Sequence, residues 1–259
     1  MRRPSCFLPL CLFLLFFFTA PLYADTITVR ADNWPPFNGD PKEAKLGYMI
    51  DVLQEIFTPL GHKIDYQLMS WDESLEAVRK GEFNAVVGAS VEDAPDFVFP
   101  KKTFGVNGNT FFIAKGSKWK FTGIPSLGKV RLGIIDSYSY DEEIDKYIEE
   151  NKESDKILSV KGEDALPLLI RMLQEGKIDA FVEDTNVALY ALIKLDISPG
   201  KILLAGQTNK LVPLQVAFSP KLKSSKGYAK QFDEGINRLR QNGRLQMILS
   251  RYGLKDWEK

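Results

Sequence analysis

Apolar and polar positions repeat with two different periods along this chain. Short apolar or alternating stretches predict strands, at residues 27–31, 62–68, 84–88, 130–135, 157–160, 178–182 and 212–218. Longer stretches with apolar residues three and four positions apart predict helices, at residues 48–60, 70–81, 139–150, 164–174, 184–195, 224–241 and 243–252. Because strands and helices alternate, the pattern indicates the α/β class.

Polar residues mark where several of these helices begin. Ser70 with Glu73, and Ser139 with Glu142, have the spacing of a capping box, in which each side chain satisfies a backbone N–H group. Asp184 stands directly before a predicted helix and is a favoured N-cap residue. These positions predict helix starts next to the ends of the preceding strands.

The chain contains a faint internal echo. Residues 80–87 resemble residues 175–182, since each segment is a helix end, a glycine and a buried strand. The echo fits two lobes of similar build, which we expect at residues 25–112 with 213–259 (lobe 1) and at 113–212 (lobe 2). If the tail packs on lobe 1, the chain crosses between the lobes twice, at 110–115 and at 210–215. Two extended crossings make a hinge.

The first 24 residues predict a secretory leader. Arg2 and Arg3 give a basic start, and the apolar run at 7–18 is too short for a comfortable membrane span. We expect cleavage near Ala24, a periplasmic protein and no lipid anchor. Both cysteines, Cys6 and Cys11, lie in this leader, so the mature chain would have no disulfide and would depend on a large core.

Charge and composition exclude several kinds of site. The chain has 34 basic and 34 acidic side chains, and removal of Arg2 and Arg3 leaves 32 against 34, a net charge of −2. This balance argues against a nucleic-acid surface. With one histidine, His62, and no mature cysteine, we expect no zinc or other metal site, no cofactor and no Ser-His-Asp triad. His62 reads as an ordinary surface or edge residue, and we expect a monomer.

An aromatic turn follows the first predicted strand. The segment Trp34-Pro35-Pro36-Phe37 contains two prolines, and each restricts the residue before it. We expect a stiff, extended turn that holds Trp34 and Phe37 as a wall for a small ligand. The alternative is that both rings fill the core of the lobe.

The order of motifs along the chain resembles a known family. The segment 34–37 is followed by Gly47-Tyr48-Met49-Ile50-Asp51, Trp71 with Leu75, the Gly81 unit, Phe97 and Pro100, the Gly176-Lys177-Ile178-Asp179-Ala180 unit, Asp184, and Asn242-Gly243. This ordered set resembles the family 3 extracellular solute-binding proteins, the polar amino-acid receptors of ABC importers. The resemblance implies a two-lobed periplasmic-binding-protein (type II) fold, a small ligand between the lobes, hinge closure and a membrane permease as partner.

The resemblance also implies roles for individual residues. It places Trp34 against the ligand with Phe37 nearby, and polar contacts at Gly88, Ala89 and Ser90. It further implies carboxylate binding by the small residues at 137–139, Ser137 to Ser139, and an amino-group partner at Asp184. Helix capping is the alternative role for Asp184 and both serines.

Three further candidates come from their positions in the sequence. Trp71 begins a helix, Tyr138 lies in a strand-to-helix turn, and Asp93 follows a buried strand. Core packing is the alternative for Trp71, and solvent exposure is the alternative for Asp93.

One departure from the family pattern bears on the ligand. The family usually places an arginine shortly after the Ser90 position, where it clamps the ligand's α-carboxylate. This chain has no arginine between Arg79 and Arg131. An inward-facing set of acids (Asp32, Asp93, Asp136 and Glu183) with aromatic rings would suit a cation. Lys101 and Lys102 could instead replace the missing arginine, and the sequence leaves both possibilities open.

These observations give one main function and two alternatives. We expect a non-catalytic binding protein that captures a small polar solute, such as an amino acid or amine, for an ABC importer. A ligand-sensing receptor for a membrane signalling partner is the first alternative. A dehydratase on the same fold is the second, with Glu183 or Asp93 as a buried acid for proton transfer.

Overall fold

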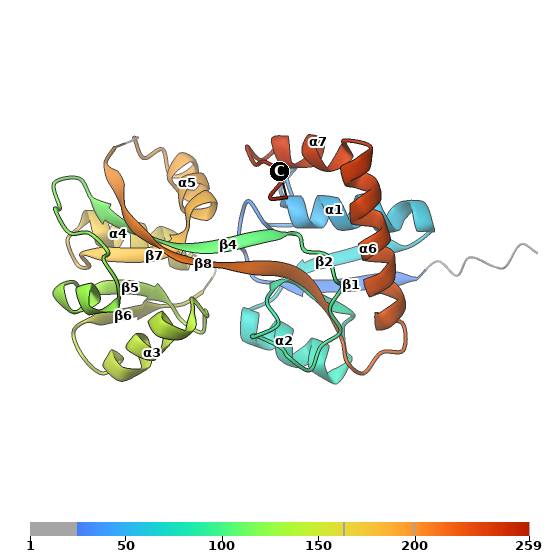
Figure 1. The fold of residues 1–259 in the computed structure, drawn as a ribbon, viewed down its shortest axis with the longest axis horizontal. Coiled ribbons are helices and arrows are strands. Elements are labelled where there is room, and N and C mark those ends of the chain that lie inside the picture. Colours follow the sequence, from blue (N-terminus) through green and yellow to red (C-terminus); the bar gives the residue numbers. More distant parts are fainter. Residues whose placement is uncertain (1–24, 163, 199, 259) are drawn as a thin grey trace, which may run out of the picture.

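The protein consists of two lobes joined by two long strands (Figure 1). This computed structural model describes residues 25–162, 164–198 and 200–258. The predicted leader at 1–24, with Cys6 and Cys11, lies outside the described residues. Within the described ranges, none of the helices has the length and apolar character needed to cross a membrane.

The first lobe is built on three parallel strands. β1 (Thr26–Ala31) lies between β2 (Lys63–Leu68) and β3 (Ala85–Ala89). One face of this sheet is covered by α1 (Tyr48–Phe57), which continues as a 3-10 turn (Thr58–Leu60), and by α6 (Ser225–Gln241) and α7 (Arg244–Ser250). α2 (Trp71–Lys80) covers the other face. Segments from both ends of the chain therefore form this lobe, as the sequence predicts.

The second lobe repeats this plan. β5 (Leu132–Ile135) pairs in parallel with β6 (Ile157–Val160) and β7 (Ala180–Asp184). The lobe also contains a 3-10 helix (Ile124–Lys129) and the helices α3 (Glu142–Asn151), α4 (Ala165–Gln174) and α5 (Thr185–Lys194). Gly81 and Gly176, the two glycines of the sequence echo, both have positive φ angles and both precede a central strand. The echo thus marks equivalent units of the two lobes.

β4 (Gly105–Ala114) and β8 (Ile202–Phe218) run antiparallel to each other between the lobes. They join all strands into one sheet with the order β2-β1-β3-β8-β4-β7-β5-β6. The predicted two-crossing fold is confirmed, but the first crossing is not at 110–115, because Thr110 already pairs with Glu183 of β7. The part of β4 that links the lobes comes before Thr110, and it faces residues 211–214 of β8.

Alternate residues of β4 point to opposite faces of the second-lobe sheet, as expected for a strand. Phe111 stacks on Phe121 at 4.2 Å between ring centroids, and Phe112 stacks on Phe181 at 5.0 Å on the other side. Burial of such a large apolar side chain stabilises the fold by about 1.5–3 kcal/mol. Cores on both faces of the sheet thus support a chain that has no cysteine after Cys11.

Two predicted helix starts are found where the sequence placed them. α2 begins after Ser70, but the predicted capping box is not formed, because the Ser70 hydroxyl donates to the Glu73 carboxylate at 2.6 Å and caps no backbone N–H group. α5 begins after Asp184, whose carboxylate accepts from the backbone N–H groups of Asn186 and Val187. The cap of α5 fixes the position of Asp184 at the end of β7.

The start predicted for α3 is wrong. The N-cap is Asp141, which accepts from the backbone N–H of Ile144 at 2.9 Å. Ser139 instead donates to Asp145 at 2.8 Å, so it makes no capping box with Glu142. A second favoured N-cap residue, two positions nearer the helix, displaces the serine from this role.

The predictions for the aromatic turn and for His62 also need correction. The turn is tight rather than extended, because the carbonyl oxygen of Trp34 accepts from the N–H groups of both Phe37 and Asn38, and the Pro35–Pro36 bond is cis. His62 is 9% exposed and its ring lies 5.5 Å from that of Tyr228. It belongs to the packed interior and not to the surface.

Candidate functional site

Two cavities lie between the lobes and meet at a shared set of residues. The outer cleft has a volume of about 850 Å³, and the inner cavity, which reaches Gly88, Ser90, Asn107 and Tyr140, has about 70 Å³. Both are lined by Asp32, Trp34, Trp71, Tyr138 and Glu183, which we call the dividing residues. The inner cavity contains most of the predicted site.

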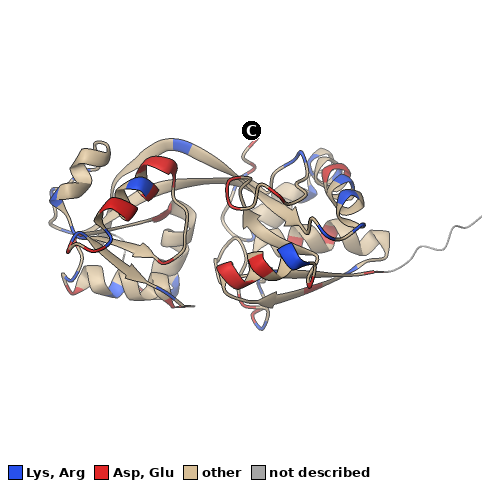
Figure 2. Cartoon of the chain, turned by 90° about the horizontal axis from the view of Figure 1, so that it is seen from below, with Lys and Arg blue, Asp and Glu red and all other residues tan. Residues whose placement is uncertain are grey.

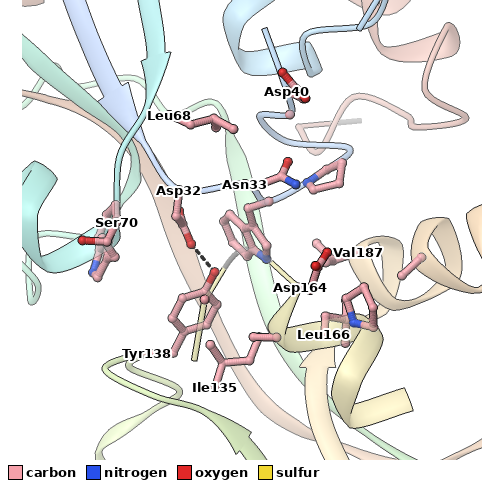
Figure 3. Close-up of a pocket in the computed structure, with 18 of the residues that line it drawn as sticks. Asp32, Asn33, Asp40, Leu68, Ser70, Ile135, Tyr138, Asp164, Leu166 and Val187 are labelled. Atoms are coloured by element: carbon pink, nitrogen blue, oxygen red, sulfur yellow. Dashed lines mark hydrogen bonds between the residues drawn. The ribbon is translucent and has the colours of Figure 1, made fainter. Parts of the chain in front are cut away.

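Hydrogen bonds between dividing residues connect the two lobes. Tyr138 Oη donates to Asp32 Oδ2, and Figure 3 shows these two side chains pointing toward each other. Trp34 Nε1 donates to Glu183 Oε1 at 3.3 Å. Asp32 and Trp34 follow β1 of the first lobe, whereas Tyr138 follows β5 and Glu183 belongs to β7 of the second. Each bond therefore spans the interface between the lobes.

Trp34 forms a wall of both cavities, whereas Phe37 does not. Phe37 is 2% exposed and packs edge-on against Trp34 and Tyr48, at 4.4 and 5.5 Å between ring centroids. The opposite side of the indole faces Gly88, where a Cβ atom would lie 3.4 Å from Trp34 Cζ3. The aromatic turn thus provides one ring to the interface between the lobes and one to the core.

The predicted site residues divide into three groups. The inner cavity is lined by Trp34, Trp71, Gly88, Ser90, Asp93, Tyr138 and Ser139. Ser137 lines only the outer cleft. Phe37, Ala89 and Asp184 are buried and line neither cavity.

Ser90 and Asp93 hold the loop after β3 in a defined shape. The backbone N–H and the hydroxyl of Ser90 both donate to Asp93 Oδ2, at 2.7 and 2.8 Å. The Ser90 hydroxyl is thus already committed to a carboxylate of its own loop. The pair gives this wall of the inner cavity a negative charge.

Asp184 caps α5, its alternative role, whereas its neighbour Glu183 lines both cavities. The Asp184 carboxylate accepts from the backbone N–H groups of Asn186, Val187 and Gly108, so its position is explained by capping. Neighbouring residues of a strand point to opposite sides, which turns Glu183 toward the cavities. The strand period indicates that only one of these two neighbours faces the cavity, but it does not say which one.

Glu183 is a buried acid with one unsatisfied oxygen. Its side chain is 4% exposed, and Oε1 accepts from the Asp184 backbone N–H at 2.7 Å as well as from Trp34. Oε2 is buried and has no hydrogen-bond partner among the described residues. Burial, together with the nearby Asp184 and Asp32 carboxylates, raises the pKa of Glu183 to about 8. A cation in the cavity would favour the ionised form of Glu183, and Oε2 would then be an acceptor for a donor of that cation.

Asn107 and Asn109 are cavity residues that the sequence analysis missed. Both lie on β4 and line the inner cavity. Asn109 donates to the backbone carbonyl of Tyr140, while Asn107 Oδ1 is buried with no partner in the described part of the chain. No motif marks these residues, and the segment Asn107-Gly108-Asn109 interrupts the apolar pattern, so no strand was predicted there.

Acidic groups dominate the inner cavity. Its lining carries the carboxylates of Asp32, Glu92, Asp93 and Glu183, and none of the described lysine, arginine or histidine side chains lines it. On the helices of the two lobes, by contrast, acidic and basic residues are interspersed (Figure 2). The outer cleft carries Asp136 and also three lysines, Lys45, Lys161 and Lys194. The cavity charge is therefore a local feature.

The missing clamp arginine is not replaced by Lys101 or Lys102. The backbone N–H groups of both lysines donate to Asp233 of α6, at 3.1 and 2.8 Å. The Lys102 ammonium lies 3.9 Å from Glu258, and neither residue lines a cavity. The lysine hypothesis is therefore wrong.

Arg79 and Arg131, which flank the stretch without arginine, also form ion pairs away from the cavities. Arg79 pairs with Asp96 at 3.0 Å, and Arg131 pairs with Asp179 at 2.8 Å. Neither lines a cavity. Over residues 25–162, 164–198 and 200–258, no group of three His, Cys, Asp or Glu side chains is placed to hold a metal ion.

Comparisons with solved structures show the same two-lobed fold. One similar structure comes from a study of glutathione import and the cystine ABC importer of Streptococcus mutans. It is 16% identical to this chain with a TM-score of 0.75, and the match covers 91% of this chain and 99% of that one. An ancestral arginine-binding protein bound to arginine is 18% identical (TM-score 0.71; 88% and 97% covered). A histidine kinase sensor domain similar to periplasmic binding proteins is 19% identical (TM-score 0.71; 89% and 98% covered).

Comparison of the sequence with curated proteins gave no match. A comparison with family models gave a match over nearly all of the part that forms the two lobes. Residues 27–255 match the bacterial extracellular solute-binding proteins, family 3, and the chain therefore belongs to this family.

Proposed function

We propose that this protein captures a small polar solute between its lobes in the periplasm and presents it to the permease of an ABC importer. The observation that carries the proposal is the pair of buried acceptors, Glu183 Oε2 and Asn107 Oδ1, at an inner cavity beside Trp34. Buried polar groups are normally satisfied, so unsatisfied ones at a cavity indicate a missing partner. Membership of a solute-binding family supports the same conclusion.

Binding would work through closure of the lobes. The inner cavity takes Trp34 and Gly88 from the first lobe and Tyr138 and Glu183 from the second. A solute that contacts both sets gains more free energy in the closed form than in an open one, and it shifts the population toward closure. β4 and β8 provide the two connections about which the lobes would move.

Thermal-shift screening and calorimetry on the purified protein test this proposal. A panel of amino acids, amines and other small polar solutes should contain at least one compound that raises the melting temperature. Trp34→Ala should remove that effect, because the indole lines both cavities. Trp119→Ala is the matched control, since Trp119 bonds to the Ser126 carbonyl within the second lobe. If no solute class binds, or Trp34→Ala binds normally, the proposed site is wrong.

A sensing role is the alternative that one comparison favours, because a histidine kinase sensor domain shares the fold. The two roles differ in the partner of the loaded protein. Reconstituted vesicles containing a permease would accumulate solute only if the protein serves transport. Ligand-dependent binding to a signalling receptor, without accumulation, would favour sensing.

A dehydratase is a second candidate because of Glu183. Its pKa of about 8 is suited to a carboxylic acid that stays protonated near neutral pH and transfers its proton in a cavity. Incubation with prephenate or arogenate, followed by detection of aromatic products, separates catalysis from binding. Turnover that is lost in Glu183→Gln would replace the binding proposal.

A further inference from the structure

The inner cavity combines unsatisfied acceptors with donors that are already used. We infer that it selects a compact aliphatic ammonium ion without a carboxylate group, rather than an α-amino acid. The inference rests on the proposed binding function and specifies the solute class. It follows from the hydrogen bonds, the charges and the size of the cavity.

Three of the side-chain donors around the cavity already serve carboxylates of the same lining. Trp34 Nε1 donates to Glu183, Tyr138 Oη to Asp32, and the Ser90 hydroxyl to Asp93. A ligand carboxylate entering this space would have to displace such bonds. It would also lie among four acidic side chains, with no cationic side chain of the described residues in the lining. Both effects disfavour an anionic group.

The acceptors without a partner favour a cationic group. Glu183 Oε2 and Asn107 Oδ1 are both buried, and neither has a partner in the described chain. An ammonium group supplies three donors and a positive charge, and hydrogen bonds to charged groups are the stronger kind. Trp34, Trp71 and Tyr138 add aromatic rings around the same space, and such rings attract organic cations through their π faces.

The volume limits the size of the cation. A cavity of about 70 Å³ holds about five water-sized groups, since each needs roughly 10–15 Å³ of this kind of space. A short amine fits within that limit. A longer aliphatic chain would extend past the dividing residues toward the outer cleft.

Calorimetry with matched pairs tests the inference, because each pair differs only by a carboxylate. The pairs are ethanolamine with serine, putrescine with ornithine, and cadaverine with lysine. At least one amine should bind about tenfold or more tightly than its amino acid. This factor is expected if the carboxylate of the amino acid must break a hydrogen bond between residues of the lining. If an amino acid binds at least as tightly as its amine in every pair, the inference is overturned while the proposed function stands. If no polar solute of any class binds, the proposed function itself fails.

Variants at the two acceptors test which residues bind the amine. A bound ammonium ion favours the ionised form of Glu183 over the protonated one. Glu183→Gln keeps the shape of the side chain but cannot ionise, so amine affinity should fall about tenfold or more. Glu149→Gln, an exposed acid of α3 that pairs with Lys152, is the matched control and should bind normally. Asn107→Leu tests the second acceptor from β4 and provides an independent result if Glu183→Gln does not fold. Unchanged amine binding in a folded variant of either residue would overturn the assignment.

Discussion

Glu183 makes the stability of the free protein depend on pH. The folded chain holds the Glu183 proton up to a pH of about 8, whereas an unperturbed glutamate releases it near 4.5. Between these values the folded state binds more protons than the unfolded state, so the free energy of unfolding falls as pH rises. The pKa values of the neighbouring Asp32 and Asp184 are also raised, mainly by burial, and they act in the same direction.

The first prediction follows for Glu183→Gln. The variant has no proton to lose at this position, so its stability should decline less than that of the wild-type protein between pH 4.5 and about 8. Urea unfolding at several pH values gives the comparison, and Glu149→Gln should keep the wild-type slope. Parallel curves for wild type and Glu183→Gln would show that Glu183 is not a protonated buried acid.

Individual residues show where sequence reasoning was sufficient and where it was not. Trp34, Trp71 and Tyr138 line both cavities, and their contact with a ligand stays a prediction. Asp184 was assigned a ligand contact that its neighbour Glu183 is better placed to make. A difference of one position reverses the direction of a side chain in a strand, and the sequence motif does not fix this register.

At the scale of elements, Gly88 near the end of β3 lies against the indole of Trp34. Gly88 has a φ angle of 82°, and a Cβ atom would contact Trp34 Cζ3 at 3.4 Å. We predict that Gly88→Ala destabilises the protein by about 1–2 kcal/mol, because this backbone region is strained for residues with a side chain. Ligand affinity should fall as well, since the added methyl group takes up space in the inner cavity beside the indole.

Thermal unfolding and calorimetry measure both effects of Gly88→Ala. Gly227→Ala in α6 is the control, since a Cβ atom there would meet nothing within 4 Å and alanine favours a helix. The proposed coupling between Gly88 and Trp34 is wrong if Gly88→Ala loses stability but binds ligand as well as wild type.

Most elements within the lobes were predictable, because periodicity and glycine stops reflect local energetics. The two linking strands were not, since no strand was predicted over β4 and only residues 212–218 of β8 were predicted. The strand at 157–160 was predicted with the bounds it has, and α4 and α6 begin one residue after their predicted starts. The first crossing was misplaced for a physical reason. β4 is one continuous strand, and only its pairing with β7 shows where the second lobe begins. Pairing between distant segments cannot be predicted from a local sequence pattern.

For the whole molecule, contacts between the lobes set the balance between open and closed forms. Exposed ion pairs join Glu43 to Lys194 at 3.0 Å and Glu92 to Lys210 at 3.4 Å. Such pairs contribute little in water, about 0–1 kcal/mol each. The Tyr138–Asp32 bond is more important, because burial already raises the pKa of Asp32 and makes an unpaired carboxylate there costly.

We therefore predict that Tyr138→Phe opens the unliganded protein. The variant keeps the ring but leaves Asp32 without its donor from the second lobe, and a carboxylate that has lost its partner is solvated best when the lobes separate. Leaving such a group buried would cost about 1–3 kcal/mol, enough to change the open population severalfold. Small-angle X-ray scattering should give a larger radius of gyration for Tyr138→Phe than for wild type. Tyr147→Phe should not differ from wild type, because the Tyr147 hydroxyl has no hydrogen-bond partner among the described residues. An unchanged radius in a folded Tyr138→Phe protein would mean that the covalent crossings and apolar contacts alone hold the lobes together.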